Sequence, residues 1–195
     1  MSSFIGSRKE LISKYGAFIV QQTKGTGILP GTLITQLIAE SSGKYNGKFL
    51  VGGSGLSRKA NNYFGIKCGP NWKGAKYDIK TREEDKNGNT YYEIACFRKY
   101  PGIEQSIQNY IQFLQGNKRY ANAGFFQEKT VIGQFKALKR AGYATSNSYV
   151  QFLTDIYIPL KKDIDAIPTT TRADLGVILP IIALFSGIAY FWKNL

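Results

Sequence analysis

The chain has 195 residues, enough for one domain with a hydrophobic core and an appendage. Its 26 Lys and Arg outnumber its 13 Asp and Glu, and the net charge of +13 suits a polyanionic neighbour: nucleic acid, anionic lipid or an anionic wall polymer. The absence of histidine excludes a Ser-His-Asp triad, a Cys-His pair and a His-ligated zinc hydrolase. Acid–base chemistry is therefore left to carboxylates, Tyr or Lys, and glycosidic bond cleavage is the commonest use of paired carboxylates.

The first predicted element is an amphipathic helix over Arg8–Gln22. Charged residues at positions 8–10 interrupt any apolar core near the start, so we expect no signal peptide. Pro30 can begin the next helix. That helix carries apolar side chains on one face and ends at Glu40; the apolar residues are Leu33, Ile34, Leu37 and Ile38.

Glu40 is the candidate catalytic residue. It ends the apolar helix and precedes a small polar turn, Ser41–Gly47. A carboxylate placed half in the core and half in a cleft is desolvated, which raises its pKa as a general acid requires. The alternative from the residue alone is a surface glutamate near a helix end.

Residues from about Gly43 to Tyr100 are rich in Gly, Asn, Lys and Tyr. Asn87-Gly88 predicts a turn between strands at Tyr77–Glu84 and Thr90–Phe97. Helical periodicity returns over three later segments: Ile103–Gly116, Thr130–Ala141 and Ser148–Leu160. The fold class is therefore α+β, mainly helical, with a small antiparallel β lobe inserted after the Glu40 helix.

Cys68 and Cys96 are the two cysteines, and two thiols give no metal framework. They could pair in an oxidising compartment or serve as small buried residues, and the sequence leaves both open. No cofactor and no metal are expected.

The C-terminal part divides into a linker, residues 164–174, and an uncharged apolar segment, residues 175–192, which leaves 1–163 as the main domain. At about 1.5 Å per residue the apolar segment nearly matches the ~30 Å core of a bilayer. Tyr190 and Trp192 stand at one end, as interface anchors do. We expect a transmembrane helix here; the alternative is a buried C-terminal core helix.

Five sequence blocks occur in a fixed order: the helix that ends at Glu40, Asn61–Lys67, Trp72-Lys-Gly74, Phe97–Tyr100 and Tyr143-Ala-Thr145. In this order they resemble the glucosaminidases of glycoside hydrolase family 73, which include bacterial autolysins and the wall-digesting domain of the flagellar rod-cap protein. The resemblance covers about Phe4 to Leu160. Gly65-Ile-Lys-Cys68 and Cys96-Phe-Arg-Lys-Tyr100 are similar to a Bacteroidetes-like branch, and they imply that the two cysteines lie near each other, as a disulfide would require.

The resemblance implies a lysozyme-like fold and cleavage of the β-1,4 bond after N-acetylglucosamine in peptidoglycan. It assigns the general acid to Glu40 and the second carboxylate to Glu83, with Glu84 and Asp85 as alternates. Substrate contacts are expected from four further residues, Tyr143, Asn62, Phe64 and Tyr45. Where the family has an Asp after Tyr-Ala-Thr, this chain has Ser146.

Two other functions stay open at this point. One is a lytic transglycosylase on the same glycan, which needs a single essential carboxylate. The other is a non-catalytic binder of wall glycan or nucleic acid. The expected partners are peptidoglycan strands and a bilayer through residues 175–192, with no specific nucleic acid. We expect the protein to be anchored by this segment in a bacterial envelope or in the membrane of a lipid-containing phage particle.

Overall fold

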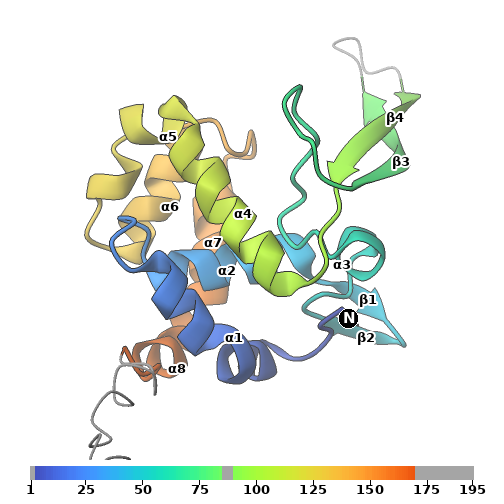
Figure 1. Ribbon diagram of the computed structural model, residues 1–195. Coiled ribbons are helices and arrows are strands. Elements are labelled where there is room, and N and C mark those ends of the chain that lie inside the picture. Colours follow the sequence, from blue (N-terminus) through green and yellow to red (C-terminus); the bar gives the residue numbers. More distant parts are fainter. Residues whose placement is uncertain (1–2, 85–89, 170–195) are drawn as a thin grey trace, which may run out of the picture.

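Helices form most of the molecule and surround one buried helix, α2 (Pro30–Ser41) (Figure 1). The computed structural model describes residues 3–84 and 90–169, with the backbone alone for 81–84. The other longer helices are α1 (Arg8–Thr23), α4 (Ile103–Gly116), α6 (Val131–Arg140) and α7 (Tyr149–Tyr157). Shorter turns of helix are α3 (Gly55–Ala60), α5 (Lys118–Asn122), η1 (Phe125–Gln127), η2 (Ile158–Leu160) and α8 (Lys161–Asp165). The helices predicted before residue 164 are thus confirmed to within a few residues at their ends.

Helix α2 differs from the one-sided apolar helix that its sequence predicts. Every residue from Gly31 to Ile38 is buried, polar ones included. The reason is that α2 contacts α1, α6, α7 and α8, so it is covered on nearly all sides. Burial ends near its C-terminus, where Ala39 and Glu40 are only half-buried. The last turn of α2 is therefore the place where this core helix reaches a surface.

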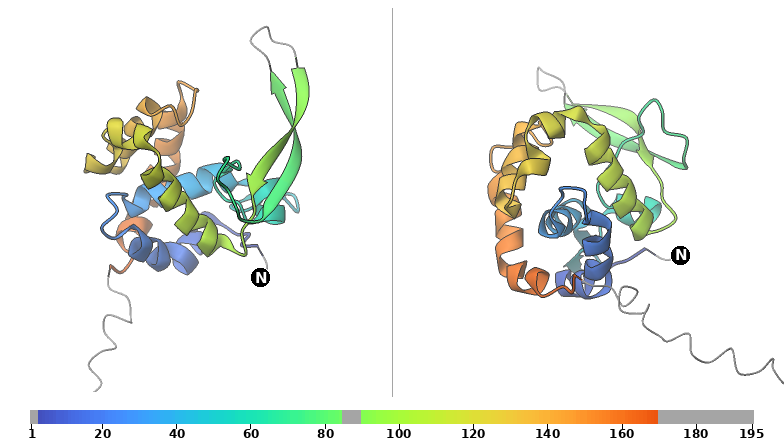
Figure 2. Two further views of the ribbon diagram at one scale, coloured as in Figure 1. Left: turned by 45° about the horizontal axis from the view of Figure 1, so that its top comes forward. Right: turned by 60° about the vertical axis from the view of Figure 1, so that its left-hand side comes forward.

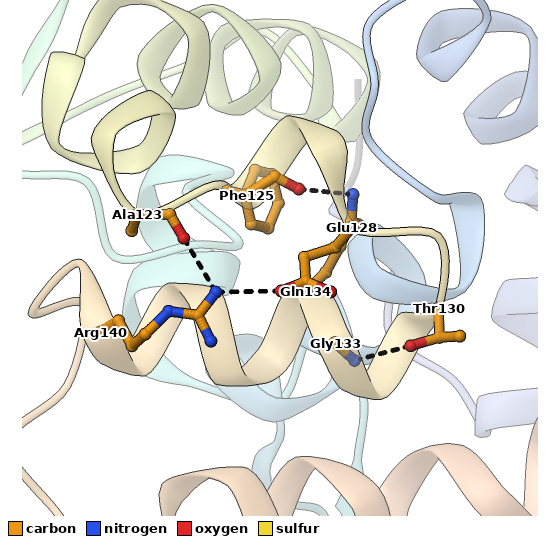
Figure 3. A network of polar contacts seen from close by, with 7 residues as sticks. All are labelled: Ala123, Phe125, Glu128, Thr130, Gly133, Gln134 and Arg140. Carbon is orange, nitrogen blue, oxygen red and sulfur yellow. Dashed lines mark hydrogen bonds and ion pairs between the residues drawn. The ribbon is translucent and has the colours of Figure 1, made fainter.

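Gln134 of α6 fixes the chain where it enters α2. Its side chain is fully buried, and its amide donates to Gly27 O at 2.6 Å and to Phe125 O at 3.2 Å. Its carbonyl oxygen accepts from Leu29 N at 3.0 Å. In Figure 3, an ion pair between Arg140 and Glu128 lies beside this network, with 2.9 Å between Arg140 Nη2 and Glu128 Oε1. The start of α2 is thus held by hydrogen bonds from an element about 100 residues away.

The β structure consists of two separate hairpins. The small one pairs β1 (Gly43–Tyr45) with β2 (Lys48–Leu50), directly after α2. The larger one pairs β3 (Lys76–Glu84) with β4 (Thr90–Arg98) in an antiparallel register that runs from Lys76 opposite Arg98 to Glu84 opposite Thr90. Figure 2 shows this hairpin extending away from the helices. The hairpin and its register confirm the strands that flank Asn87-Gly88 in the prediction.

The base of the large hairpin is tied to the segment that precedes it. A disulfide joins Cys68 to Cys96, and Cys68 N donates to Cys96 O at 2.8 Å. The Asn62 amide donates to Ile66 O at 2.9 Å and to Arg98 O at 2.8 Å, while Ile66 N donates to Asn62 Oδ1 at 3.0 Å. Asn62 therefore holds the loop 62–66 against the end of β4.

The described fold continues past residue 163, where the linker was expected to begin. Helix α8 runs to Asp165, and Ile164 and Ile167 are buried in the hydrophobic core. Residues 3–84 and 90–169 contain no helix long and apolar enough to cross a membrane. The segment 175–192, predicted to do so, lies outside the described residues.

Candidate active site

Glu40 lines a cavity of about 340 Å³ where the end of α2 meets the segment before the large hairpin. The other residues that line the cavity come from the loop 64–67, from α4 (Phe113), from α5 (Arg119) and from the loop after α6 (Tyr143). Elements that are far apart in sequence therefore converge on one carboxyl group.

Burial raises the pKa of Glu40 from its ordinary 4.5 to about 7. The physical cause is desolvation, which disfavours the charged carboxylate. Arg119 lines the same cavity, yet the ion pairs among the described residues do not include Glu40. A carboxyl group with this pKa is substantially protonated near neutral pH, which is the state a general acid needs.

Tyrosine rings surround the carboxyl group on the helical side of the cavity. Tyr143 stacks on Tyr149 with 5.9 Å between ring centroids, and meets Tyr110 edge-on at 6.3 Å. Burial raises the pKa of Tyr143 and Tyr149, and the nearby Glu40 charge raises it further. These phenols therefore keep their protons and can donate hydrogen bonds.

The side chain of Gln36 forms hydrogen bonds with the hydroxyl groups of two of these tyrosines. It lies one helical turn before Glu40 and is fully buried. Tyr110 OH donates to Gln36 Oε1 at 2.5 Å, and Gln36 Nε2 donates to Tyr149 Oη at 3.1 Å. Because an amide nitrogen can only donate, Tyr149 must accept here, and its own proton is left for a partner on another side.

The structure brings two of the four expected substrate contacts to the cavity. Tyr143 and Phe64 both line it, and Phe64 also stacks on Tyr110 with 4.0 Å between ring centroids. Asn62 does not line it: the side chain is 1% exposed and its amide holds backbone groups. Tyr45 lies in β1, outside this cavity, where Arg58 covers its ring at 5.3 Å.

Glu83 and Glu84, two candidates for the second carboxylate, lie at the end of β3 that is far from the Cys68–Cys96 disulfide. The backbone pairs Glu83 with Tyr91 and Glu84 with Thr90, while Asp85 lies outside the described residues. Glu93 of β4, which was not predicted, pairs with Lys67 at 3.8 Å, and Lys67 lines the cavity. Position 83 faces position 91, two residues from 93, so positions 83 and 93 share one face of the hairpin.

Sequence reasoning missed Gln36, Tyr149 and Phe113. Gln36 carries a usable signal, since residues four apart on a helix lie on the same side and Glu40 was already a candidate. Tyr149 and Phe113 carry none, because periodicity assigns them to helices but does not tell which helices meet.

The described residues contain no cluster of three or more Cys, Asp or Glu able to hold a metal ion. A larger cavity, about 610 Å³, lies on α2, α6, α7 and α8, and its lining is mostly apolar. Its charged residues are Lys129, Lys161 and Asp165, and the last two pair with each other. The candidate for the chemistry is therefore Glu40, whose carboxyl group lines a cavity and has no ion-pair partner among the described residues.

Comparison with known proteins identifies relatives over most of the chain. The glucosaminidase family model, described as mannosyl-glycoprotein endo-beta-N-acetylglucosaminidase, matches residues 16–162. The peptidoglycan hydrolase FlgJ of Pseudomonas aeruginosa is 34% identical over 105 residues, which are 50% of this chain and 24% of that protein. FlgJ of Salmonella typhimurium is 33% identical over 117 residues, 58% of this chain and 35% of that protein. The matches thus span about a quarter to a third of these curated relatives.

Solved structures share the fold. The catalytic domain of the autolysin Auto from Listeria monocytogenes is 24% identical with a TM-score of 0.66, over 81% of this chain and 86% of that one. A C-terminally truncated glycoside hydrolase domain of FlgJ from Salmonella typhimurium is 26% identical with a TM-score of 0.58, over 80% of this chain and 99% of that one. The mainly helical, lysozyme-like fold with small antiparallel sheets agrees with the expected fold class.

Proposed function

This chain belongs to the glucosaminidase family, and from that membership we propose that it is a peptidoglycan hydrolase. The bond cleaved is the β-1,4 glycosidic bond after N-acetylglucosamine in the glycan strand. One observation carries the proposal: Glu40 lies in the last turn of a buried helix and lines a cavity, and burial raises its pKa to about 7. That is the environment of a carboxyl group that gives a proton to a leaving oxygen.

The reaction begins with proton transfer from Glu40 to the glycosidic oxygen. The bond to the anomeric carbon then breaks through an oxocarbenium-like transition state, and water adds to that carbon. Tyr143, kept neutral beside Glu40, donates a hydrogen bond to the bound sugar and orients its acetamido group, while Tyr149 stacks on Tyr143 from the core side. Glu40 then recovers its proton from water.

A second carboxylate on the hairpin stabilises the positive charge or activates the water. We propose Glu83 for this role, with Glu84 and Asp85 as alternates. The support is the register: position 83 shares a hairpin face with Glu93, whose partner Lys67 lines the Glu40 cavity. Replacing Glu83 with Gln should lower hydrolysis strongly, whereas a transglycosylase would keep most of its activity.

Digestion of purified peptidoglycan tests the proposal. Wild-type protein should release new reducing ends, and Glu40→Gln should reduce the rate by at least a hundredfold, since general acid catalysis contributes roughly 10²–10⁴. Asp155→Asn is the control, because Asp155 is an exposed carboxylate on α7. Mass spectrometry of the products then identifies the bond.

Each competing function predicts a different product pattern. Anhydro sugar ends would assign the chain to the lytic transglycosylases. Binding of glycan with no cleavage by wild-type protein would make it a non-catalytic binder. New N-acetylglucosamine reducing ends, absent with Glu40→Gln, are the result that the proposal requires.

We further propose that residues 175–192 anchor the enzyme to a bilayer, in a bacterial envelope or in the membrane of a lipid-containing phage particle. The support is the uncharged sequence of this segment and the aromatic residues at its end. Flotation of the full chain with lipid vesicles, compared with a chain that ends at Thr169, tests the anchor. Equal flotation of the two would contradict it.

A further inference from the structure

The Glu40 cavity adjoins a second cavity of about 390 Å³, and Phe113 of α4 lines both. The second cavity lies over the last turns of α4 and the loop 69–72, on the side of the large hairpin's base. From Phe113 to Gly116, the last turn of α4, the wall of the second cavity extends ~4.5 Å along the helix. The two cavities therefore lie on either side of Phe113, which is part of the lining of each.

Amide groups dominate the polar lining of this second cavity. Its side chains include Asn71, Asn109, Gln112 and Asn117, together with the Arg98 guanidinium, and none of the lining residues carries a carboxylate. Amides offer both donors and acceptors, whereas the guanidinium only donates. Such a lining suits a neutral ligand that carries amide and hydroxyl groups, and disfavours a cationic one.

One wall of the second cavity is held rigid by hydrogen bonds and stacking. Asn109 Oδ1 accepts from Arg98 Nη1 and from Tyr100 OH, each at 2.7 Å. The Arg98 guanidinium lies over the Trp72 ring at 4.6 Å from its centroid, and Trp72 Nε1 donates to Ala75 O at 3.0 Å. The Asn109 oxygen is engaged twice and its nitrogen donates to Gln112 Oε1 at 3.5 Å, which leaves the second amide hydrogen of Asn109 and the amide nitrogen of Gln112 as donors for a ligand.

Phe113 supplies an apolar surface between the two cavities. The ring is half-buried and packs against Tyr110, with ring centroids 6.1 Å apart, and against Tyr120, with centroids 6.0 Å apart. Packing on both partners fixes its position. A fixed aromatic ring beside amide groups matches a pyranose, whose ring hydrogens are apolar and whose substituents are polar.

We propose that this second cavity is a binding subsite for an N-acetylated sugar, the unit next to the one held at Glu40. The inference rests on the proposed function and adds the chain-length preference of the same cleft. Phe113 contacts the sugar ring, and the amides of Asn109 and Gln112 bind its acetamido group. The enzyme should therefore favour glycan fragments long enough to fill both cavities.

Gln112 provides the test, because it is exposed on α4 and lines only the second cavity. Gln112→Ala removes one amide, and Gln112→Trp fills the space. Gln115→Ala and Gln115→Trp are matched controls, since Gln115 is an exposed residue of the same helix that lines neither cavity. We expect Gln112→Ala to raise KM for a peptidoglycan octasaccharide about threefold to tenfold, the cost of one hydrogen bond. Gln112→Trp should raise it further, while turnover of the shortest substrate that is cleaved stays within twofold.

Binding measurements separate this inference from the proposed function. In a Glu40→Gln background, calorimetric titration with the octasaccharide should show weaker binding for Gln112→Trp than for Gln115→Trp. Equal binding and equal KM for the two sites would overturn the subsite. A wild-type protein that binds the octasaccharide through Gln112 but releases no reducing ends would keep the subsite and overturn the hydrolase.

Discussion

The amide of Gln36 donates a hydrogen bond to the hydroxyl of Tyr149, which lies 113 residues later in the chain. The donor sits one turn before Glu40 in α2, and the acceptor belongs to the first turn of α7. This bond fixes the direction in which Tyr149 can offer its own proton, beside the carboxyl group that we propose as the general acid.

Replacing Gln36 with Leu should therefore lower kcat/KM more than its effect on folding explains. The change leaves the hydroxyls of Tyr110 and Tyr149 without their amide partner, at a stability cost of about 1–3 kcal/mol. Gln134→Leu is the control, since Gln134 is an equally buried glutamine outside the Glu40 cavity. Denaturant unfolding and kcat/KM, measured as a function of pH, compare the two. If both variants lose activity only in proportion to stability, Gln36 has no positioning role.

The pH dependence of hydrolysis should follow Glu40. A general acid works in its protonated form, and burial raises the pKa of Glu40 to about 7. The value of kcat/KM should therefore fall as the pH rises through about 7. Well above pH 7 it should fall nearly tenfold for each pH unit. Gln36→Glu, which places a second negative charge one turn away, should move this limb to higher pH. An alkaline limb near pH 4.5 would mean that Glu40 is solvated in the working enzyme.

Glu40 should also make the fold less stable at alkaline pH. Its folded-state pKa lies above the unfolded value of 4.5, so the folded protein holds the proton more tightly. The contribution of Glu40 to the free energy of unfolding is therefore highest below pH 4.5, declines up to about pH 7 and stays level above it. The full shift corresponds to at most about 3 kcal/mol, and solvent in the cleft reduces it.

Glu40→Gln removes this titration, so it should raise Tm at pH 8 and leave it nearly unchanged at pH 4. At roughly 2–4 °C per kcal/mol the difference is measurable by calorimetry. Asp155→Asn should show no such pH-dependent gain. A loss of Tm in Glu40→Gln at both pH values would show that the carboxyl group is stabilising.

Reduction of the Cys68–Cys96 disulfide should loosen the base of the large hairpin. The bond spans 28 residues, for which the chain-entropy model gives ~3–4 kcal/mol. We expect dithiothreitol to lower kcat/KM and to expose the 76–98 segment to limited proteolysis. The double variant Cys68→Ser with Cys96→Ser should behave like the reduced protein and no longer respond, because the chain has no other cysteine. Unchanged proteolysis on reduction would mean that Asn62 and the backbone pairing hold the lobe alone.

Much of this architecture was predictable from local signals. Asn87-Gly88 between two β-rich runs predicted the two paired strands, though not their register, and the apolar stripe of Ile103–Gly116 predicted α4 with its exact ends. Glu40 was a candidate because an apolar helix ends there in a polar turn, and the structure places it at a cavity. These features depend on residues close in sequence, where periodicity and turn chemistry act.

The contacts between elements were not predictable. Periodicity assigned α2 one apolar face, but four neighbouring helices bury Thr32, Thr35 and Gln36 as well. Asn62, expected to bind substrate, holds backbone groups of two distant segments. Which polar residue faces a cleft and which closes a buried hydrogen bond is decided by tertiary packing.

The rings around Glu40 are shared between the reaction site and the interior of the protein. Tyr110 and Tyr149 belong to the hydrophobic core, and Tyr143 packs against it. Heat should therefore destroy activity in the same step that melts the helices, with no inactive but folded stage. For anyone who evolves this enzyme toward a new substrate, the exposed side of α4, with Gln112 and Gln115, can be varied without opening the core, whereas changes to the tyrosines should lower the melting temperature.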